Sequence, residues 1–229
     1  MATTITYIMN TFEAIESRKS VRAFTSQEVD RATIEKILNA AKCAPSGVNM
    51  QPWKVSVLTG QSKESLSDKM EQAFRDGVKQ KMDYAYYPKV FEGVYKERRK
   101  EMGLLMYTKL GITREDKQRQ IDQWALNYRA FNAPVMLIFS IDSSLEQGSY
   151  LDYGMFIQTI MIAAADLGLA TCPQAALGEY PDIVRNELGL SDNEEIVCGM
   201  SLGYEDKTHD VNSFDTSRVE LSDFVNFFD

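Results

Sequence analysis

Two short stretches, one helix apart, dominate the interpretation of this sequence: SRKSVRAF at residues 17–24 and APSGVNMQPW at residues 44–53. The first places three cations, Arg18, Lys19 and Arg22, beside two serine hydroxyls in an acidic chain. Arginine donates paired N–H groups and serine donates a hydroxyl, and both groups bind phosphate. The same cations could instead pair with nearby glutamates on a solvated surface, and these residues alone leave both interpretations open.

The second stretch is a loop, because its prolines, glycine and asparagine disfavour regular structure. Gly47 leaves backbone N–H groups accessible after Pro45, while Ser46 and Asn49 add a hydroxyl and a side-chain amide. Such a loop can bind the polar edge of a planar heterocycle. It is also the kind of segment that simply joins a helix to a strand.

Periodicity on either side of these stretches predicts helices intermixed with strands. Caps such as Asp30 and stops such as Gly168 bound the helices, and three apolar runs have strand length. Residues 76–112 form an excursion or lid, irregular to about residue 100 and helical after it, and residues 204–229 form a C-terminal arm. The expected helices cover residues 11–17, 31–41, about 66–74, about 101–110, 114–130, 154–167 and 181–188, and the expected strands cover 53–59, 135–141 and 195–202. This pattern predicts one domain over residues 1–229, with a sheet between helices.

Composition excludes several classes of protein. The 229 residues are 44% hydrophobic and 25% charged, which is typical of a globular domain, and the net charge of -8 disfavours nucleic acid or an anionic membrane as a partner. Three widely spaced cysteines indicate reduced thiols and a cytoplasmic location. No apolar stretch is long enough to span a membrane, and a single histidine, His209, rules out a His-rich metal site.

The sequence GMSLG at residues 199–203 matches the Gly-x-Ser-x-Gly pattern of serine hydrolases. That pattern needs a sharp turn at the serine and a helix behind it. Ser201 instead lies within a predicted strand, and His209 follows too closely to act as its base. The chain also lacks a Gly-x-Gly-x-x-Gly fingerprint and a P-loop. We therefore assign no catalytic nucleophile.

Taken together, the first two stretches resemble those of the flavin-dependent nitroreductase superfamily. The resemblance continues, in order, through NAP at residues 132–134, GLATC at 168–172, GY at 203–204 and SR at 217–218. It covers nearly the whole chain. The central segments YAYYP, YKERR and LGITRED, at residues 84–88, 95–99 and 110–116, look like those of the nitrobenzoate-reductase-like branch.

The resemblance implies an α+β nitroreductase-like fold with a central mixed sheet, in an intertwined homodimer with FMN at the subunit interface. Arg18, Lys19, Ser20 and Arg22 would hold the phosphate, the ribityl chain and part of the ring, and Arg218 would close on the phosphate. This sequence has Lys19 where the family usually has a second arginine. The other cofactor-binding residues that the resemblance implies are Pro45, Ser46, Gly47, Asn49, Gln158, Pro173, Gln174, Ala175 and Gly203.

The implied activity is an FMN-dependent oxidoreductase. NADH or NADPH would give a hydride to the flavin, leave, and be replaced by a planar acceptor such as a nitroaromatic or a quinone, in a ping-pong mechanism. No side chain needs to act as a catalytic residue. Tyr86 and Arg99 are the expected acceptor-binding residues, through stacking and through a carboxylate contact. A specialised reduction such as reductive dehalogenation, or a non-catalytic flavin-binding protein, are the alternatives.

Overall fold

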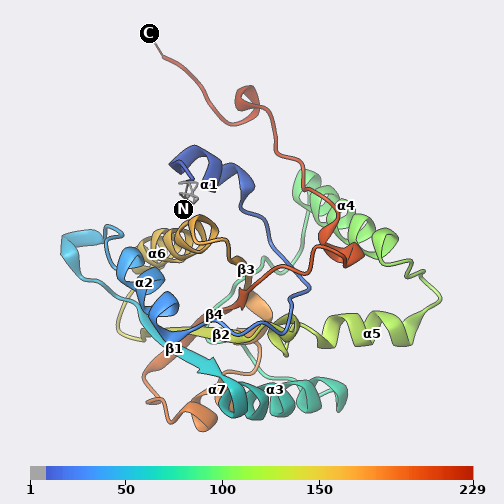
Figure 1. The fold of residues 1–229 in the computed structure, drawn as a ribbon, viewed down its shortest axis with the longest axis horizontal. Coiled ribbons are helices and arrows are strands. Elements are labelled where there is room, and N and C mark those ends of the chain that lie inside the picture. The colour runs from blue at the N-terminus through green and yellow to red at the C-terminus, as the bar shows by residue number, and fades with distance from the viewer. Residues whose placement is uncertain (1–8, 229) are drawn as a thin grey trace, which may run out of the picture.

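The computed structural model describes residues 9–228, and its centre is a four-stranded sheet in the order β1-β2-β4-β3 (Figure 1). Every neighbouring pair of these strands is antiparallel. Three of the strands match the sequence prediction to within a residue at each end. The strands are β1 (Lys54–Thr59), β2 (Val135–Asp142), β3 (Ala170–Gln174) and β4 (Glu194–Gly203).

The prediction of a mixed sheet needs a correction. β2 and β3 run in the same direction, but β4 lies between them and pairs antiparallel with both. Among the described residues, the one parallel pairing is an isolated bridge between Ser20 and Thr171. The connection from β2 to β3 therefore crosses over β4, and it leaves no parallel neighbours within the sheet.

Sequence reasoning missed strand β3. It has only five residues, and it contains Pro173, which cannot donate a ladder hydrogen bond. The structure accommodates the proline because β3 is an edge strand that pairs only with β4. The isolated bridge from Ser20 continues this edge for one residue.

Helices cover both faces of the sheet (Figure 1). β2 shows why, because its side chains alternate between two cores: Leu137 and Phe139 pack with α2 and α6, whereas Met136 and Ile138 pack with α3 and α7. A strand buried on both faces is apolar throughout, as predicted. The α-helices among the described residues are α1 (Thr11–Ser17), α2 (Arg31–Ala41), α3 (Gly60–Arg75), α4 (Gly93–Lys109), α5 (Lys117–Ala125), α6 (Gln147–Asp166) and α7 (Pro181–Leu188).

Three helices, α3, α4 and α6, begin earlier than their apolar patterns predict, whereas α5 is shorter than expected at both ends. α6 begins at Gln147 instead of about residue 154, because its first two turns bury the polar groups of Asp152 and Tyr153. The Tyr153 hydroxyl bonds both backbone groups of Lys54, at 3.1 and 2.6 Å. α4 begins at Gly93, and none of its residues is buried. The excursion is therefore irregular only to residue 92.

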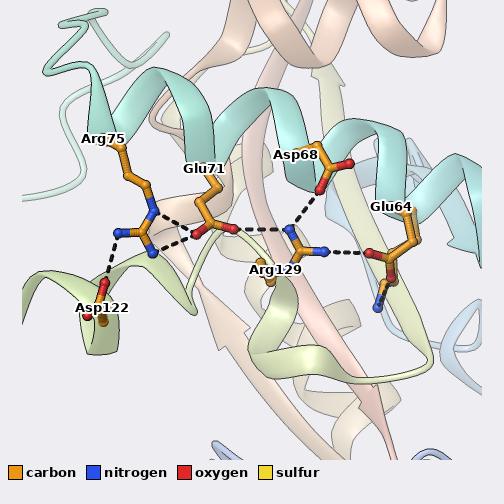
Figure 2. A network of polar contacts seen from close by, with 7 residues as sticks. Glu64, Asp68, Glu71, Arg75, Asp122 and Arg129 are labelled. Carbon is orange, nitrogen blue, oxygen red and sulfur yellow. Dashed lines mark hydrogen bonds and ion pairs between the residues drawn. The ribbon is translucent and has the colours of Figure 1, made fainter. Parts of the chain in front are cut away.

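A charged network joins α3 to α5 and to the segment before β2 (Figure 2). Arg129 contacts Glu64, Asp68 and Glu71, all on α3. The next three residues, Ala130–Asn132, have left-handed backbone angles, with φ between 49° and 58°. This conformation is costly for residues with a side chain. The network therefore secures the start of a strained turn that leads directly into β2.

No helix among residues 9–228 is long and apolar enough to cross a membrane.

Candidate functional site

The cationic segment, residues 17–22, lies along the free edge of β3. The Val21 N–H donates to the carbonyl of Thr171 at 3.0 Å, next to the bridge at Ser20. Ser20, Arg18 and Arg22 all act on the buried thiol of Cys172. Burial raises the pKa of Cys172 to about 11, while Arg22, the Ser20 hydroxyl and Arg18 oppose that rise. The structure thus gathers these three predicted residues around one thiol.

Arg218 joins the group from the C-terminal arm. The pKa of Arg18 is lowered first by burial and second by the positive charge of Arg218. The Arg218 guanidinium donates only to its own neighbours, to the carbonyl of Thr216 at 2.9 Å and of Ser217 at 3.1 Å. Two residues 200 positions apart in the sequence are therefore close in space, as the resemblance implies.

These arginines have no carboxylate partner in the described part of the chain. None of the ion pairs there includes Arg18, Arg22 or Arg218. Like charges held together in a partly buried place repel one another unless an anion lies between them. The arrangement is suited to a phosphate, which accepts several charge-assisted hydrogen bonds.

Lys19 is oriented differently from its neighbours. Its Nζ pairs with Glu205 at 2.8 Å and donates to the carbonyl of Asn212 at 2.8 Å. Among residues 9–228, Lys19 therefore has a carboxylate partner, unlike Arg18 and Arg22. A surface pocket of about 390 Å³ borders Arg18, Lys19 and Glu205 and extends to the end of α6. The lysine therefore ties the segment to the C-terminal arm.

The 45–49 loop lies at the other end of α6. The Gly47 N–H donates to the buried carboxylate of Asp152 at 3.1 Å, and the Ser46 hydroxyl accepts from the backbone of Gln51 at 2.9 Å. Asn49 has a left-handed φ of 58° and an exposed side chain, and Pro45 is also exposed. The loop is held in one conformation while its amide faces outward.

One chain does not bring the two motifs together. The loop contacts α6 at Asp152, whereas the pocket beside the cationic segment is bordered by Met161 and Ala165. A helix rises 1.5 Å per residue, so about 14 to 20 Å of α6 separates Asp152 from Met161 and Ala165. Gln158 lies between them, half-buried and without a hydrogen-bond partner among residues 9–228.

The end of β3 includes a side chain that sequence reasoning placed at the cofactor. Gln174 is buried, and its amide is fully used: Oε1 accepts from Ser201 at 2.5 Å and Nε2 donates to Asn127 at 3.0 Å. Only the backbone of Gln174 is left for a ligand. Pro173 and Ala175, on either side, are half-buried.

Gly203 has a packing role. A Cβ at this position would lie 2.5 Å from the Cδ of Pro134 and 3.2 Å from the ring of Phe24. No side chain fits there, so glycine is needed for β4 to pass the start of β2. Gly203 is buried at the end of β4 in this chain, and its role at the cofactor stays a prediction.

The predicted acceptor-binding residues lie on the excursion. Tyr86 is exposed and packs against Tyr84 and Tyr87, with ring centroids 6.0 and 4.6 Å away. The Arg99 guanidinium lies 4.6 Å above the ring of Phe91, which in turn contacts Tyr87. Aromatic rings and one cation therefore form a continuous exposed surface.

The two buried thiols, Cys172 and Cys198, and the serine of the Gly-x-Ser-x-Gly match are not placed to act as nucleophiles. Ser201 is buried within β4 and bonded to Gln174. Burial raises the pKa of Cys198 to about 12, so both buried thiols are neutral at physiological pH. Among residues 9–228, no cluster of three histidine, cysteine or acidic side chains could hold a metal ion.

Sequence reasoning missed two residues of this region, Asn212 and Asp152. Both are buried polar side chains that bond backbone groups more than 100 positions away. In the sequence each is a single polar residue without a motif. Their hydrogen bonds join residues that are distant in sequence, so no local sequence pattern predicts them.

Comparison with known proteins agrees with this geometry. The model of the nitroreductase family matches residues 15–204. A 4-nitrobenzoate reductase of Pseudomonas putida is 40% identical over 217 residues, covering 94% of this chain and 95% of the relative. A chloronitrobenzene nitroreductase of Comamonas testosteroni is 37% identical over 221 residues, covering 94% of this chain and 95% of the relative.

Solved structures show the same similarity. The FMN- and NADPH-dependent nitroreductase NfnB from Sphigopyxis sp. strain HMH superposes with a TM-score of 0.92 at 35% identity, covering 96% of this chain and 100% of the other. The FMN-dependent nitroreductase NfnB from Mycobacterium smegmatis, in complex with NADPH, superposes with a TM-score of 0.91 at 33% identity. The match covers 95% of this chain and 97% of the other. The match spans the cationic segment, the 45–49 loop and the whole sheet. The chain belongs to the nitroreductase family.

Proposed function

We propose that this protein is an FMN-dependent NAD(P)H oxidoreductase that reduces nitroaromatic, quinone or similar planar acceptors. The observation that carries the proposal is the group of uncompensated arginines, Arg18, Arg22 and Arg218, around Ser20. The named reductases and FMN-dependent structures that the chain resembles support it.

The donor set fits FMN. A phosphate monoester carries up to two negative charges, and the three guanidinium groups and one hydroxyl of this region can neutralise and bond it. The backbone around Pro173–Ala175 and the amides of Gln158 and Asn49 suit a heterocycle with alternating donors and acceptors. Riboflavin, which lacks the phosphate, would leave the arginines uncompensated.

Residues of the chain bind and orient, and none of them carries the redox step. Bound FMN supplies hydride transfer between NAD(P)H and the acceptor. Arg18, Ser20 and Arg218 would hold the cofactor by its phosphate, next to the neutral, buried thiol of Cys172. Tyr86 and its aromatic neighbours provide a flat surface for the acceptor, and Arg99 provides a cation for an acceptor with a carboxylate.

The site is completed by a second copy of the chain, in a homodimer. Within one chain, about 14 to 20 Å of α6 separates the contact of the 45–49 loop from those beside the cationic segment, so a second copy brings its loop to the first copy's arginines. The exposed apolar side chains that such a dimer would bury are Phe12, Ile15, Leu151, Met155, Leu221, Phe224 and Phe227. They lie on α1, on α6 and on the arm, which extends away from the body of the protein (Figure 1).

Anaerobic titration with NADPH tests the proposal. The purified protein, supplemented with FMN, should be yellow. When it is mixed with NADPH, the flavin absorbance at about 450 nm should disappear, because the flavin is reduced. Addition of 4-nitrobenzoate should restore the colour. A colourless protein that takes up no FMN would contradict the proposal, and a yellow protein that NADPH cannot bleach would favour a flavin-binding protein instead.

Steady-state kinetics test the order of events. The chain has no dinucleotide fingerprint, so NAD(P)H and the acceptor must use one pocket in turn. Double-reciprocal plots at several fixed acceptor concentrations should be parallel. Intersecting lines would show that both substrates bind together.

A further inference from the structure

Asn212 is the most heavily bonded side chain between the cationic segment and the C-terminal arm. It lies in the short 3-10 helix η4 (Asp210–Asn212) and is 5% exposed. Its Oδ1 accepts from the backbone N–H of Arg22 at 2.9 Å. Its Nδ2 donates to the carbonyls of Ala23 at 2.8 Å and Asp206 at 2.9 Å. The side-chain amide therefore bonds three backbone groups on two segments.

The backbone of Asn212 is used as well. Its carbonyl accepts from the Nζ of Lys19 at 2.8 Å, and its N–H donates to the carbonyl of His209 at 2.9 Å. Around it, the Asp206 N–H donates to Ala23 at 3.0 Å, and Lys19 pairs with Glu205. Asn212 is thus the centre of a junction in which residues 19–23 and 205–212 are fixed to each other.

The chain beyond this junction is exposed. The described arm residues from 213 to 228 are all exposed or half-buried, and Arg218 bonds only Thr216 and Ser217 there. Arg218 follows Asn212 by six residues, a reach of at most about 20 Å. The anchor at Asn212 therefore limits the region near Arg18 that Arg218 can occupy.

Resting on the proposed function, we infer that Asn212 is a positioning residue for the phosphate group of FMN. It fixes the backbone of Arg22 on one side and the origin of the Arg218 arm on the other. Asn212 does not touch the cofactor. It fixes the backbone of one cation, Arg22, and the start of the segment that carries another, Arg218, and a buried amide does this because both its donor and acceptor groups have defined directions.

The test compares two flavins in apo-protein, by quenching of flavin fluorescence. In Asn212→Ala, we expect the Kd for FMN to rise about tenfold or more, while the Kd for riboflavin changes less than twofold. A general loss of stability would weaken both flavins by the same factor, because both need the same folded protein. Asn186→Ala is the matched control, since Asn186 is exposed on α7 beyond the opposite face of the sheet, and it should leave both Kd values unchanged.

A double-mutant cycle adds an independent readout. If Asn212 positions Arg218, then Arg218→Ala should weaken FMN binding much less in the Asn212→Ala protein than in the wild type. Should Asn212→Ala fold poorly, Asn212→Ser retains a hydroxyl donor and acceptor, and the same cycle applies to it.

Equal losses for FMN and riboflavin, no loss for either, or fully additive effects with Arg218→Ala would each overturn the inference. The failure of the proposed function looks different. In that case the wild-type protein itself would bind neither flavin, and the inference would fall with it.

Discussion

Two groups of arginines in this protein differ in how their charges are compensated. In the network of Figure 2, Arg129 contacts three carboxylates of α3, and Arg75 contacts Glu71 and Asp122 at 2.7 and 2.8 Å. The pKa of Arg129 is raised, chiefly by its hydrogen bond to Asp68, and that of Arg75 by its bond to Asp122. Each cation there is stabilised by partners in its own chain.

The arginines of the candidate site show the opposite. The pKa of Arg18 is lowered, first by burial and then by Arg218, and Arg22 and Arg218 have no acidic partner within residues 9–228. Burial and mutual repulsion raise the free energy of these charged side chains in the folded protein. Binding of an anionic ligand would offset that cost. The comparison separates arginines that stabilise the fold from arginines whose charge is suited to an anionic ligand.

The largest expected effect is on cofactor binding. Arg18→Ala should weaken FMN binding by about 1.5 to 3 kcal/mol, roughly ten- to a hundredfold, because it removes charge-assisted bonds to the phosphate. Fluorescence titration of apo-protein with FMN measures this. The thermal stability of the apo-protein should not fall, since removal of Arg18 relieves its repulsion with Arg218. Unchanged FMN affinity would place Arg18 outside the cofactor site.

The matched substitution in the other group should have the reverse outcome. Arg129→Ala should lower the free energy of unfolding by about 1 to 2 kcal/mol, because three partly exposed ion pairs are lost together. Urea denaturation of the apo-protein measures the change, and FMN affinity should stay within twofold of the wild type. A large loss of FMN affinity would show that the network also shapes the site.

The sequence predicted those elements whose cause is local. Asp30 caps α2 by accepting from the Thr33 N–H at 2.8 Å, and the apolar run of β2 is buried on both faces, as expected. Gly168 ends α6 with a φ of 73° at its predicted place. A helix cap, an apolar strand and a helix-ending glycine each depend on residues close in sequence, so a local pattern predicts them.

What the sequence could not supply depends on distant partners. Nothing near Lys19 indicates that Glu205 will pair with it, and nothing near Arg22 indicates that Asn212 will fix its backbone. β3 is short and contains a proline, so only its pairing with β4 makes it a strand. The family resemblance supplied the grouping of Arg18 with Arg218, which no spacing along the chain reveals.

Arg99 offers a third kind of arginine, exposed and stacked on a ring instead of paired. Arg99→Ala should raise the KM for a nitrobenzoate by about tenfold and leave that for uncharged nitrobenzene unchanged, because only the first acceptor has a carboxylate to contact. Lys109→Ala, at the far end of α4, is the control for net charge. Equal changes for both acceptors would mean that Arg99 does not distinguish them.

The smallest expected effect is a pH dependence of stability at Cys172, which reports on the uncompensated arginines directly. Burial raises the pKa of this thiol from 9.0 to about 11 in the folded protein. A raised pKa favours the protonated form, so the contribution to stability is complete below pH 9 and is lost as the pH rises toward 11.

At pH 10 this loss should be about 1 kcal/mol relative to pH 8. The Cys172→Ala protein has no thiol to titrate at this position, so it lacks this pH-dependent loss. The difference in unfolding free energy between wild type and Cys172→Ala should therefore narrow by about 1 kcal/mol from about pH 8 to pH 10. Cys43→Ala, at an exposed thiol, should show no such change. Arg22→Ala should extend the range to higher pH, because Arg22 is the strongest of the groups that oppose the rise. A difference that stays constant with pH would mean that the cations fully offset the effect of burial on the pKa of Cys172.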